Sequence, residues 1–426
     1  MVLNQHSIKG NNFCTKCLLV VMLLLLASCS SGRELVGAPN LFSKGEGYPT
    51  AGLLPYQKTT TPRLFYITDR QADNSGSYDA KRSPSMAFGH VDVSYGDDLS
   101  WHNLVALSAS TEKANSIPLQ VNQVVETTHF PRTPLPFYIK NGQIKTLPQA
   151  KQAYDTKTAE VHETLAGELQ KTNRKDIVLF VHGFNNSFEH AALSLADVWH
   201  YTGRVGVPVF YSWPAGNRGL TGYFKDTEAV KFSIFHFKEA IRILSSTPGL
   251  ERIHIVAHSR GTEVVTTGLR ELIIEHRARG LSPRHSLKIQ NLILAAPDLD
   301  FGVVQQRLIA ERFGPAFGQI TVYLNQNDGA LGLSQRIASG RRFGRLTFDD
   351  LSEGDKKIFS RVKNVHFVDI QNVQGLIRHA YFRENPGVLS DIAIAIRYNA
   401  RPGHPKRPLE NTAINFWKLP KGYPFQ

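Results

Sequence analysis

The chain has 426 residues, of which 42% are hydrophobic, so it can bury one large core or two modest ones. That hydrophobic content excludes global disorder. The formal net charge is +13, with a local basic cluster over residues 401–421 and no accompanying nucleic-acid recognition motif. Such a charge could attract anionic lipid headgroups or an acidic envelope surface, but we favour the alternative of a basic surface that is simply solvated, and we expect no nucleic-acid partner.

Residues 1–28 have the form of an export signal. Two basic residues precede an apolar run over residues 18–27, which is too short to span a bilayer. The run ends in Leu-Ala-Ser-Cys, which resembles a bacterial lipoprotein box in which Cys29 is lipidated and becomes the mature N-terminus. A plain secretory signal or a short membrane anchor is the alternative. By the same resemblance, Ser30 indicates an outer-membrane location facing the periplasm.

All three cysteines, Cys14, Cys17 and Cys29, fall within or directly after this signal. The mature chain therefore has no thiol pair, which excludes a disulfide framework, a cysteine zinc site and a cysteine nucleophile. We expect neither a metal nor an organic cofactor.

The next part of the chain is predicted to be a tether followed by a β-rich section. Residues 29–62 are rich in Gly, Ser, Pro and Thr and predict a tether from the lipid anchor to the folded body. Residues 63–147 are expected to supply early antiparallel strands of the sheet, although a separate small domain is the alternative. The predicted strands cover 63–68, 89–95, 121–130 and 137–144, with a loop over 69–85 and a hairpin turn at Asn141-Gly142.

Helices and strands alternate over residues 148–400, which predicts an α/β fold with a mostly parallel central sheet and helices on both faces. Residues 401–426 are Pro- and Lys-rich and predict an irregular basic tail. The predicted strands are 176–181, 207–213, 253–257, 287–295, 320–324 and 365–370. The predicted helices are 149–172, 187–202, 227–245, 262–275, 303–312 and 388–398.

The central motif is Ala257-His258-Ser259-Arg260-Gly261, which lies between a predicted strand and a predicted helix. It resembles the nucleophile elbow of α/β-hydrolases, with Ala257 where glycine is commoner. A sharp turn there would expose the Ser259 hydroxyl, and the backbone N–H of Arg260 would be free to stabilise an oxyanion. The alternative is a serine in an ordinary turn of a parallel sheet.

A second turn, His182-Gly183-Phe184, follows the predicted strand 176–181. It resembles the His-Gly turn of lipases and esterases, where the residue after the glycine supplies a backbone N–H to the oxyanion hole. Phe184 is therefore the candidate partner of Arg260. The alternative is a turn in which Asn186 or Ser187 caps the next helix, and both interpretations can hold together.

A serine nucleophile also needs a base and an acid, each on a loop after a strand. Asp328 follows the second strand after the elbow and is the preferred acid, with Asp298 and Asp300 as rivals; Asn327-Asp328-Gly329 is also a turn signal by itself. His379 follows the last strand and is the preferred base. His258 adjoins the nucleophile, but the elbow should direct its side chain away.

Five strings occur in order: Phe-Val-His-Gly-Phe-Asn, Tyr-Ser-Trp-Pro-Ala, Ala-His-Ser-Arg-Gly, Ala-Ala-Pro-Asp-Leu-Asp and His-Ala-Tyr-Phe. Together they resemble a bacterial α/β-hydrolase family of unknown physiological function whose members are described as serine esterases. The resemblance spans about residues 63–400 and implies the α/β-hydrolase fold and a hydrolase activity.

We therefore predict a serine hydrolase of the carboxylesterase or lipase-like kind that uses Ser259, His379 and Asp328 on an ester or lipid-like substrate. A non-catalytic envelope binding or scaffold lipoprotein on the same fold, and an acyltransferase, are the alternatives. Residues 216–223 and 313–317 are candidate lid or pocket elements.

Overall fold

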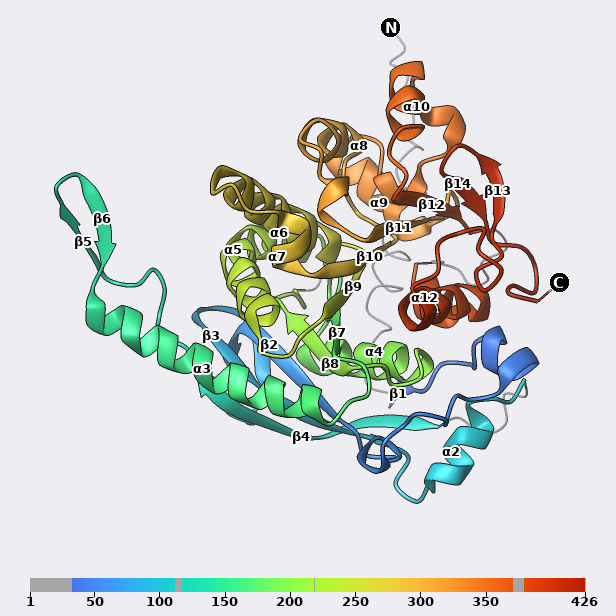
Figure 1. The fold of residues 1–426 in the computed structure, drawn as a ribbon, viewed down its shortest axis with the longest axis horizontal. Coiled ribbons are helices and arrows are strands. Elements are labelled where there is room, and N and C mark those ends of the chain that lie inside the picture. The colour runs from blue at the N-terminus through green and yellow to red at the C-terminus, as the bar shows by residue number, and fades with distance from the viewer. Residues whose placement is uncertain (1–32, 112–116, 218, 371–378, 426) are drawn as a thin grey trace, which may run out of the picture.

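The structure is a computed structural model that describes residues 33–111, 117–217, 219–370 and 379–425. These residues form one 12-stranded sheet flanked by helices and a separate two-stranded hairpin (Figure 1). The predicted signal peptide and Cys29 lie outside the described residues.

The centre of the sheet is parallel, as predicted, in the order β2-β8-β7-β9-β10-β11-β12. Because β8 lies on one side of β7 and β9 on the other, the chain reverses its direction of winding at β7. The bounds are β2 Arg63–Ala72, β7 Asp176–Val181, β8 Val207–Ser212, β9 Arg252–His258, β10 Ile289–Ala295, β11 Gln319–Leu324 and β12 Val365–Asp369.

The β-rich N-terminal section belongs to this same sheet. β3 (Tyr78–Tyr95) pairs antiparallel with β2, and β4 (Pro118–His129) pairs antiparallel with β3. The predicted loop over 69–85 is wrong for most of its length, since β2 continues to Ala72 and β3 begins at Tyr78. A register shift within the β2–β3 pair lets these polar residues extend the strands.

Residues 33–62 are packed against the body, and the predicted tether is wrong for this part. β1 (Arg33–Glu34) pairs with β4, and the Arg33 guanidinium lies 2.6 Å from the buried Asp197 carboxylate. Phe42 and Tyr48 are buried beside Tyr201 and His200 of the helix that carries Asp197. The sequence did not predict this packing because the segment is rich in Gly and Pro, and its few large anchoring side chains follow no helical or strand periodicity.

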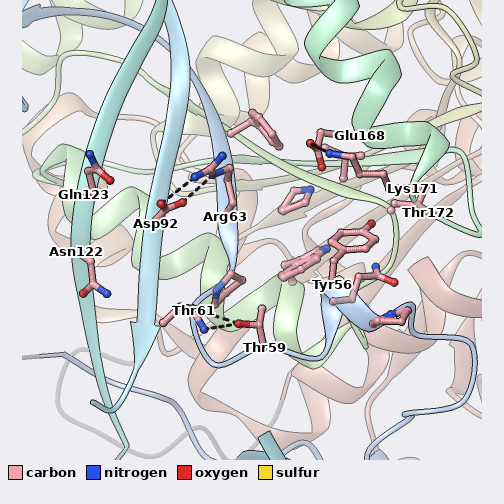
Figure 2. Close-up of a pocket in the computed structure, with 18 residues that line it drawn as sticks. Tyr56, Thr59, Thr61, Arg63, Asp92, Asn122, Gln123, Glu168, Lys171 and Thr172 are labelled. Carbon is pink, nitrogen blue, oxygen red and sulfur yellow. Dashed lines mark hydrogen bonds and ion pairs between the residues drawn. The ribbon is translucent and has the colours of Figure 1, made fainter. Parts of the chain in front are cut away.

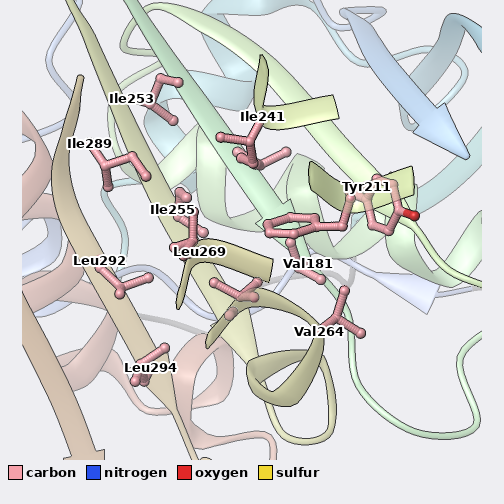
Figure 3. Packing of buried hydrophobic residues seen from close by; sticks show 14 of the residues in the cluster. Val181, Tyr211, Ile241, Ile253, Ile255, Val264, Leu269, Ile289, Leu292 and Leu294 are labelled. Atoms are coloured by element: carbon pink, nitrogen blue, oxygen red, sulfur yellow. The ribbon is translucent and has the colours of Figure 1, made fainter. Parts of the chain in front are cut away.

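Helices cover both faces of the sheet (Figure 1). One face packs against α3, α5 and α6, and the other against α4 and α12. β7 explains how a strand serves both faces: Ile177, Leu179 and Val181 join the first core, whereas Val178 and Phe180 join the second. Figure 3 shows part of the first core, with Leu269 of α6 packed near Ile255 of β9.

The helix bounds are α2 Trp101–Leu107, α3 Pro148–Gln170, α4 Phe188–Tyr201, α5 Gly219–Ser246, α6 Gly261–Ala278, α7 Pro283–Leu287, α8 Phe301–Val303, α9 Gly329–Ala338, α10 Glu353–Phe359, α11 Tyr381–Glu384 and α12 Pro386–Tyr398. A π-helical turn, η3 (Val304–Ile309), continues α8. Within the described ranges, none of the helices combines the length and apolar character that crossing a bilayer requires.

The C-terminal segment is part of the fold, and the predicted irregular tail is wrong. β14 (Phe416–Lys418) pairs parallel with β12, and β13 (Glu410–Ala413) pairs antiparallel with β14. Arg407 and Asp391 form a fully buried ion pair at 2.7 Å, and the Tyr423 hydroxyl donates to the same carboxylate at 2.6 Å. These long-range partners anchor a segment whose Pro and Lys content suggests irregular chain.

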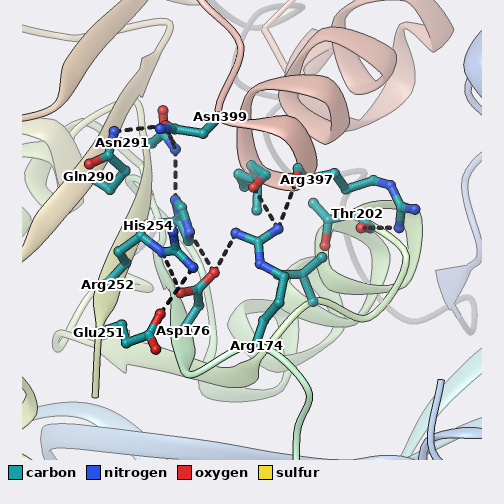
Figure 4. Close-up of polar contacts among 12 residues, drawn as sticks. Arg174, Asp176, Thr202, Glu251, Arg252, His254, Gln290, Asn291, Arg397 and Asn399 are labelled. Atoms are coloured by element: carbon teal, nitrogen blue, oxygen red, sulfur yellow. Dashed lines mark hydrogen bonds and ion pairs between the residues drawn. The ribbon is translucent and has the colours of Figure 1, made fainter. Parts of the chain in front are cut away.

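A polar cluster joins the amino ends of β7 and β9, at the edge of the sheet opposite the carboxyl ends (Figure 4). The buried Asp176 carboxylate accepts from Arg252 at 2.8 Å, contacts His254 at 3.3 Å and pairs with Arg174. Burial alone would raise the pKa of Asp176, but the His254 hydrogen bond and the two guanidinium groups outweigh it and hold that pKa well below its usual value.

Candidate active site

The loops after β7 and β9 lie next to each other at the carboxyl edge of the sheet. Val181 pairs with Ala257 in register, so the His182-Gly183 turn and the Ser259 turn leave the sheet side by side. Crevices of open α/β sheets form at such a reversal of strand order.

Ser259 lies at the sharp turn between β9 and α6. Its φ is +52°, a left-handed conformation that costs a non-glycine residue energy and recurs at functional turns. The Ser259 N–H donates to the Ala295 carbonyl of β10 at 2.9 Å, and the Thr262 hydroxyl donates to the Ser259 carbonyl at 2.6 Å. The turn is therefore held from both sides, and α6 begins directly after it.

The structure brings Ser259, His379 and Asp328 into one hydrogen-bonded chain. His379 Nδ1 lies 2.8 Å from Asp328 Oδ2, and His379 Nε2 lies 2.8 Å from Ser259 Oγ. Because the carboxylate can only accept, Nδ1–H donates to Asp328, and Nε2 is left to accept from the Ser259 hydroxyl. This is the arrangement in which an imidazole can take the serine proton.

The surroundings of His379 favour its protonated form. Burial by itself would lower the pKa of His379, but the Asp328 charge and its hydrogen bond outweigh burial, and the pKa is raised. Asp328 is buried and also accepts from the Leu331 N–H of α9 at 2.9 Å, which fixes the carboxylate in place. An imidazolium formed at His379 would therefore be stabilised.

The rival acids lie elsewhere. Asp298 accepts from the Ser334 hydroxyl at 2.7 Å and lies 3.5 Å from the Arg260 guanidinium. Asp300 caps α8 by accepting from the Val303 N–H at 3.0 Å. Neither carboxylate is hydrogen-bonded to His379, whereas Asp328 is.

The His258 side chain packs against His379 and Phe382. Its ring lies 4.8 Å from the His379 ring and 4.5 Å from Phe382, and its Nε2 is 3.3 Å from the His379 carbonyl oxygen. Burial, reinforced by the neighbouring His379, holds the pKa of His258 well below its usual value. A neutral His258 therefore packs against His379 without competing for its proton.

The candidate oxyanion residues lie beside Ser259. Gly183 lies so close to the elbow that a Cβ at this position would be 2.8 Å from the Ser259 Cβ. Phe184 is the next residue in that turn, and Arg260 is the next residue after Ser259. Only a glycine lets the first turn approach the serine this closely.

Tyr223, at the start of α5, bridges the surroundings of both candidate oxyanion residues. Its ring lies 5.8 Å from the Phe184 ring, and its hydroxyl accepts from Arg260 Nη1 at 3.0 Å. The same hydroxyl is 3.1 Å from Ser334 Oγ of α9. Sequence reasoning placed Tyr223 in a candidate lid segment without a role, because its partners lie 37 to 111 residues away.

Arg70 is a second residue that sequence reasoning missed. Its buried guanidinium donates to the carbonyls of Asn186 at 2.8 Å and Ala215 at 2.7 Å, and it lies 3.3 Å from His182 Nε2. Burial lowers the pKa of Arg70 to about 10, so the group remains charged at neutral pH. Arg70 thus joins the loops after β7 and β8 behind the candidate oxyanion turn.

Hollows occur both beside this site and away from it. A hollow of about 940 Å³ lies by the start of β2 and β8, between residues such as Arg63, Asp92 and Glu168 (Figure 2). A smaller one of about 260 Å³ is lined by Arg260 and Asp298 and therefore adjoins the elbow. Phe313 and its neighbours, expected as pocket elements, line an apolar cavity of about 220 Å³. No group of three or more His, Cys, Asp or Glu side chains able to hold a metal occurs in the described part of the chain.

A parallel sheet with helices on both faces and a serine at a strand-to-helix turn defines the class of α/β-hydrolases. Residues 157–397 match the model of a family described as alpha/beta hydrolases of unknown function (DUF900), and the chain belongs to this family. The fold and family expected from the sequence are thus confirmed.

Among solved structures, the chain is similar to a protein described as a predicted CIB-like hydrolase from Thermoplasma acidophilum. The identity is 16% and the TM-score 0.32, over 53% of this chain and 87% of that one. No curated protein matches the chain.

Proposed function

We propose that this α/β-hydrolase is a serine ester hydrolase of the carboxylesterase or lipase-like kind. The observation that carries the proposal is the chain of hydrogen bonds from Ser259 through His379 to Asp328, with 2.8 Å at each step. Its geometry matches what a serine nucleophile requires of its base and of the group that orients the base.

In the proposed mechanism, Ser259 Oγ attacks the ester carbonyl carbon while its proton passes to His379 Nε2. The backbone N–H groups of Phe184 and Arg260 stabilise the oxyanion of the tetrahedral intermediate. The C–O bond to the alcohol then breaks, and His379 gives its proton to the departing oxygen. Water repeats the sequence on the acyl-enzyme and releases the acid.

Fluorophosphonate labelling of the intact protein tests the proposal, because this probe reacts only with an activated serine. The parent should label, and Ser259→Ala should not. Asp298→Asn should still label, whereas Asp328→Asn and His379→Ala should label far more slowly. A folded parent that stays unlabelled would instead favour a binding or scaffold role on a hydrolase fold.

Hydrolysis and acyl transfer share the acyl-enzyme and need a separate experiment. Product analysis of an ester with a competing alcohol or amine distinguishes them. We propose water as the acceptor, so free acid should remain the main product.

We also propose that the mature chain begins at a lipidated Cys29 and is held at the cell envelope, on the outer membrane facing the periplasm. The support is the sequence of residues 18–29 alone. Mass spectrometry of the mature N-terminus should find a diacylglyceryl-modified Cys29, and Cys29→Ser should release the protein from the membrane fraction.

A further inference from the structure

A β-hairpin projects from the body without packing on it. β5 (Phe137–Lys140) and β6 (Gln143–Thr146) pair only with each other, and all eight residues are exposed. The turn residues Asn141 and Gly142 have φ of +53° and +72°, as a tight hairpin turn requires. Figure 1 shows the hairpin extending beyond the end of α3, away from the sheet.

The two faces of the hairpin differ in chemistry. Residues paired across an antiparallel ladder share a face, so Phe137 and Ile139 lie with Ile144 and Thr146. The exposed fractions of Phe137, Ile139 and Ile144 are 56%, 70% and 73%. The other face carries Tyr138, Lys140, Gln143 and Lys145. Two strands alone are marginally stable in water, so an apolar face presented in this way indicates an occupant.

The charge around the hairpin indicates which occupant. Residues 130–150 contain three basic side chains, Arg132, Lys140 and Lys145, and no acidic one, whereas Lys151 of α3 is paired with Asp155. Apolar and aromatic side chains beside lysines suit the boundary between acyl chains and anionic headgroups. A protein partner of matching charge would need an acidic, apolar groove, whereas an anionic bilayer supplies both layers at once.

The hairpin leaves the sheet at the same edge as the candidate active site. His129, the last residue of β4, pairs with Ala87 of β3, which pairs with Thr68 of β2. Thr68 in turn pairs with Ser212, the last residue of β8. β9, which leads into Ser259, ends at this edge as well. Five strand spacings, about 24 Å, separate β4 from β9. Phe224, near the start of α5 at this edge, is 63% exposed.

We propose that the β5–β6 hairpin is a docking element for an anionic lipid bilayer, which holds the carboxyl edge of the sheet against the membrane surface. Ile139, Ile144 and Phe137 enter the acyl boundary, and Lys140 and Lys145 contact the headgroups. Docking is independent of catalysis. Its consequence, that Ser259 meets a lipid ester of that bilayer, rests on the function proposed above.

An environment-sensitive fluorophore at Ile139→Cys tests docking, in the full chain with its three native cysteines replaced by Ser so that no lipid is attached at Cys29. The matched control is Lys171→Cys, which lies at the far end of α3, a helix about 35 Å long that separates it from the hairpin. On phosphatidylglycerol vesicles the hairpin probe should gain fluorescence about threefold, and the control should not. If the protein were held on the vesicles only by the apolar residues 18–27, the hairpin probe would have no reason to respond more strongly than the control probe.

The double substitution Ile139→Ser and Ile144→Ser should lower the hairpin's insertion, read from a probe at Phe137→Cys, by about tenfold or more. The same changes at the exposed Ile274 and Ile358 should leave it unchanged. The proposal would be overturned if the fluorescence of the hairpin probe did not rise on phosphatidylglycerol vesicles, or if it rose equally on phosphatidylcholine vesicles. A rise without lipid that grows with protein concentration would also overturn it and would indicate that a second copy of the chain covers the hairpin. Hydrolysis of a soluble short-chain ester, measured alongside, should be unaffected and tests the catalytic proposal separately.

Discussion

Gly261 and His182 are in direct backbone contact: a Cβ at position 261 would lie 2.1 Å from the His182 carbonyl oxygen. The first residue of α6 is thereby packed onto the end of β7. The two turns that carry Arg260 and Phe184 consequently hold each other in position.

Gly261→Ala should therefore reduce kcat/KM on a soluble ester by about a hundredfold, because the turns must separate and the two N–H groups move off the oxyanion. Steady-state kinetics with fluorophosphonate labelling measure the effect. Gly167→Ala in α3, where a Cβ would meet nothing within 4 Å, is the matched control and should behave as the parent. Parent-like activity in Gly261→Ala would show that the contact does not position the turns.

The pH dependence of activity should reflect the raised pKa of His379. The base works only when neutral, so kcat/KM should fall as the pH drops through a value above the ordinary histidine pKa of about 6.5. Asp328→Asn removes the charge that raises this pKa and leaves burial, which lowers it. The acidic limb should then move to lower pH, and kcat should fall about 10⁴-fold. If the acidic limb of the variant's pH profile stayed in place, the group that titrates in this limb would not be His379.

Tyr223→Phe should lower kcat about tenfold, because it removes the hydroxyl between Arg260 and Ser334 while keeping the ring against Phe184. KM for a small ester should change little. The control is Thr227→Val, which removes the acceptor of the other Arg260 nitrogen but leaves the link to α9 intact. If both variants lose activity equally, the position of the Arg260 guanidinium is important for activity, and the link from Tyr223 to Ser334 is not.

Arg407→Met should lower the free energy of unfolding by about 3–5 kcal/mol, since it leaves the Asp391 carboxylate buried without its partner. Urea unfolding measures the loss. Adding Asp391→Asn should recover part of it, because the buried charge is then gone. A loss below about 1 kcal/mol in the single variant would mean that the C-terminal segment is not anchored by this pair.

Local patterns carried most of what the sequence revealed. The alternating strands and helices predicted the parallel sheet, and the short motifs around Ser259 and His182 predicted where its loops meet. Asp328 and His379 followed from topology, since each ends up beyond a strand that points to the same edge. Their preference over Asp298 and His258 rested on position along the chain.

Long-range pairing is what the sequence did not show. Arg33 meets Asp197, and Arg70 meets the carbonyl of Asn186, across separations of 164 and 116 residues. Such contacts involve single side chains in irregular or strand-end segments, where no periodicity marks them. The predicted tether and tail were wrong for this reason: their composition is that of linkers, but a few arginines and aromatic residues anchor them.

The two ends of the large sheet bear on how the protein behaves when crowded. The outermost strands of its described part, β1 and β13, have only 2 and 4 residues. Short outer strands offer little unpaired backbone to a neighbouring molecule, which is how natural sheets avoid polymerising edge to edge. Even at high local concentration, these two edges therefore give a neighbouring molecule few backbone groups with which to extend the sheet.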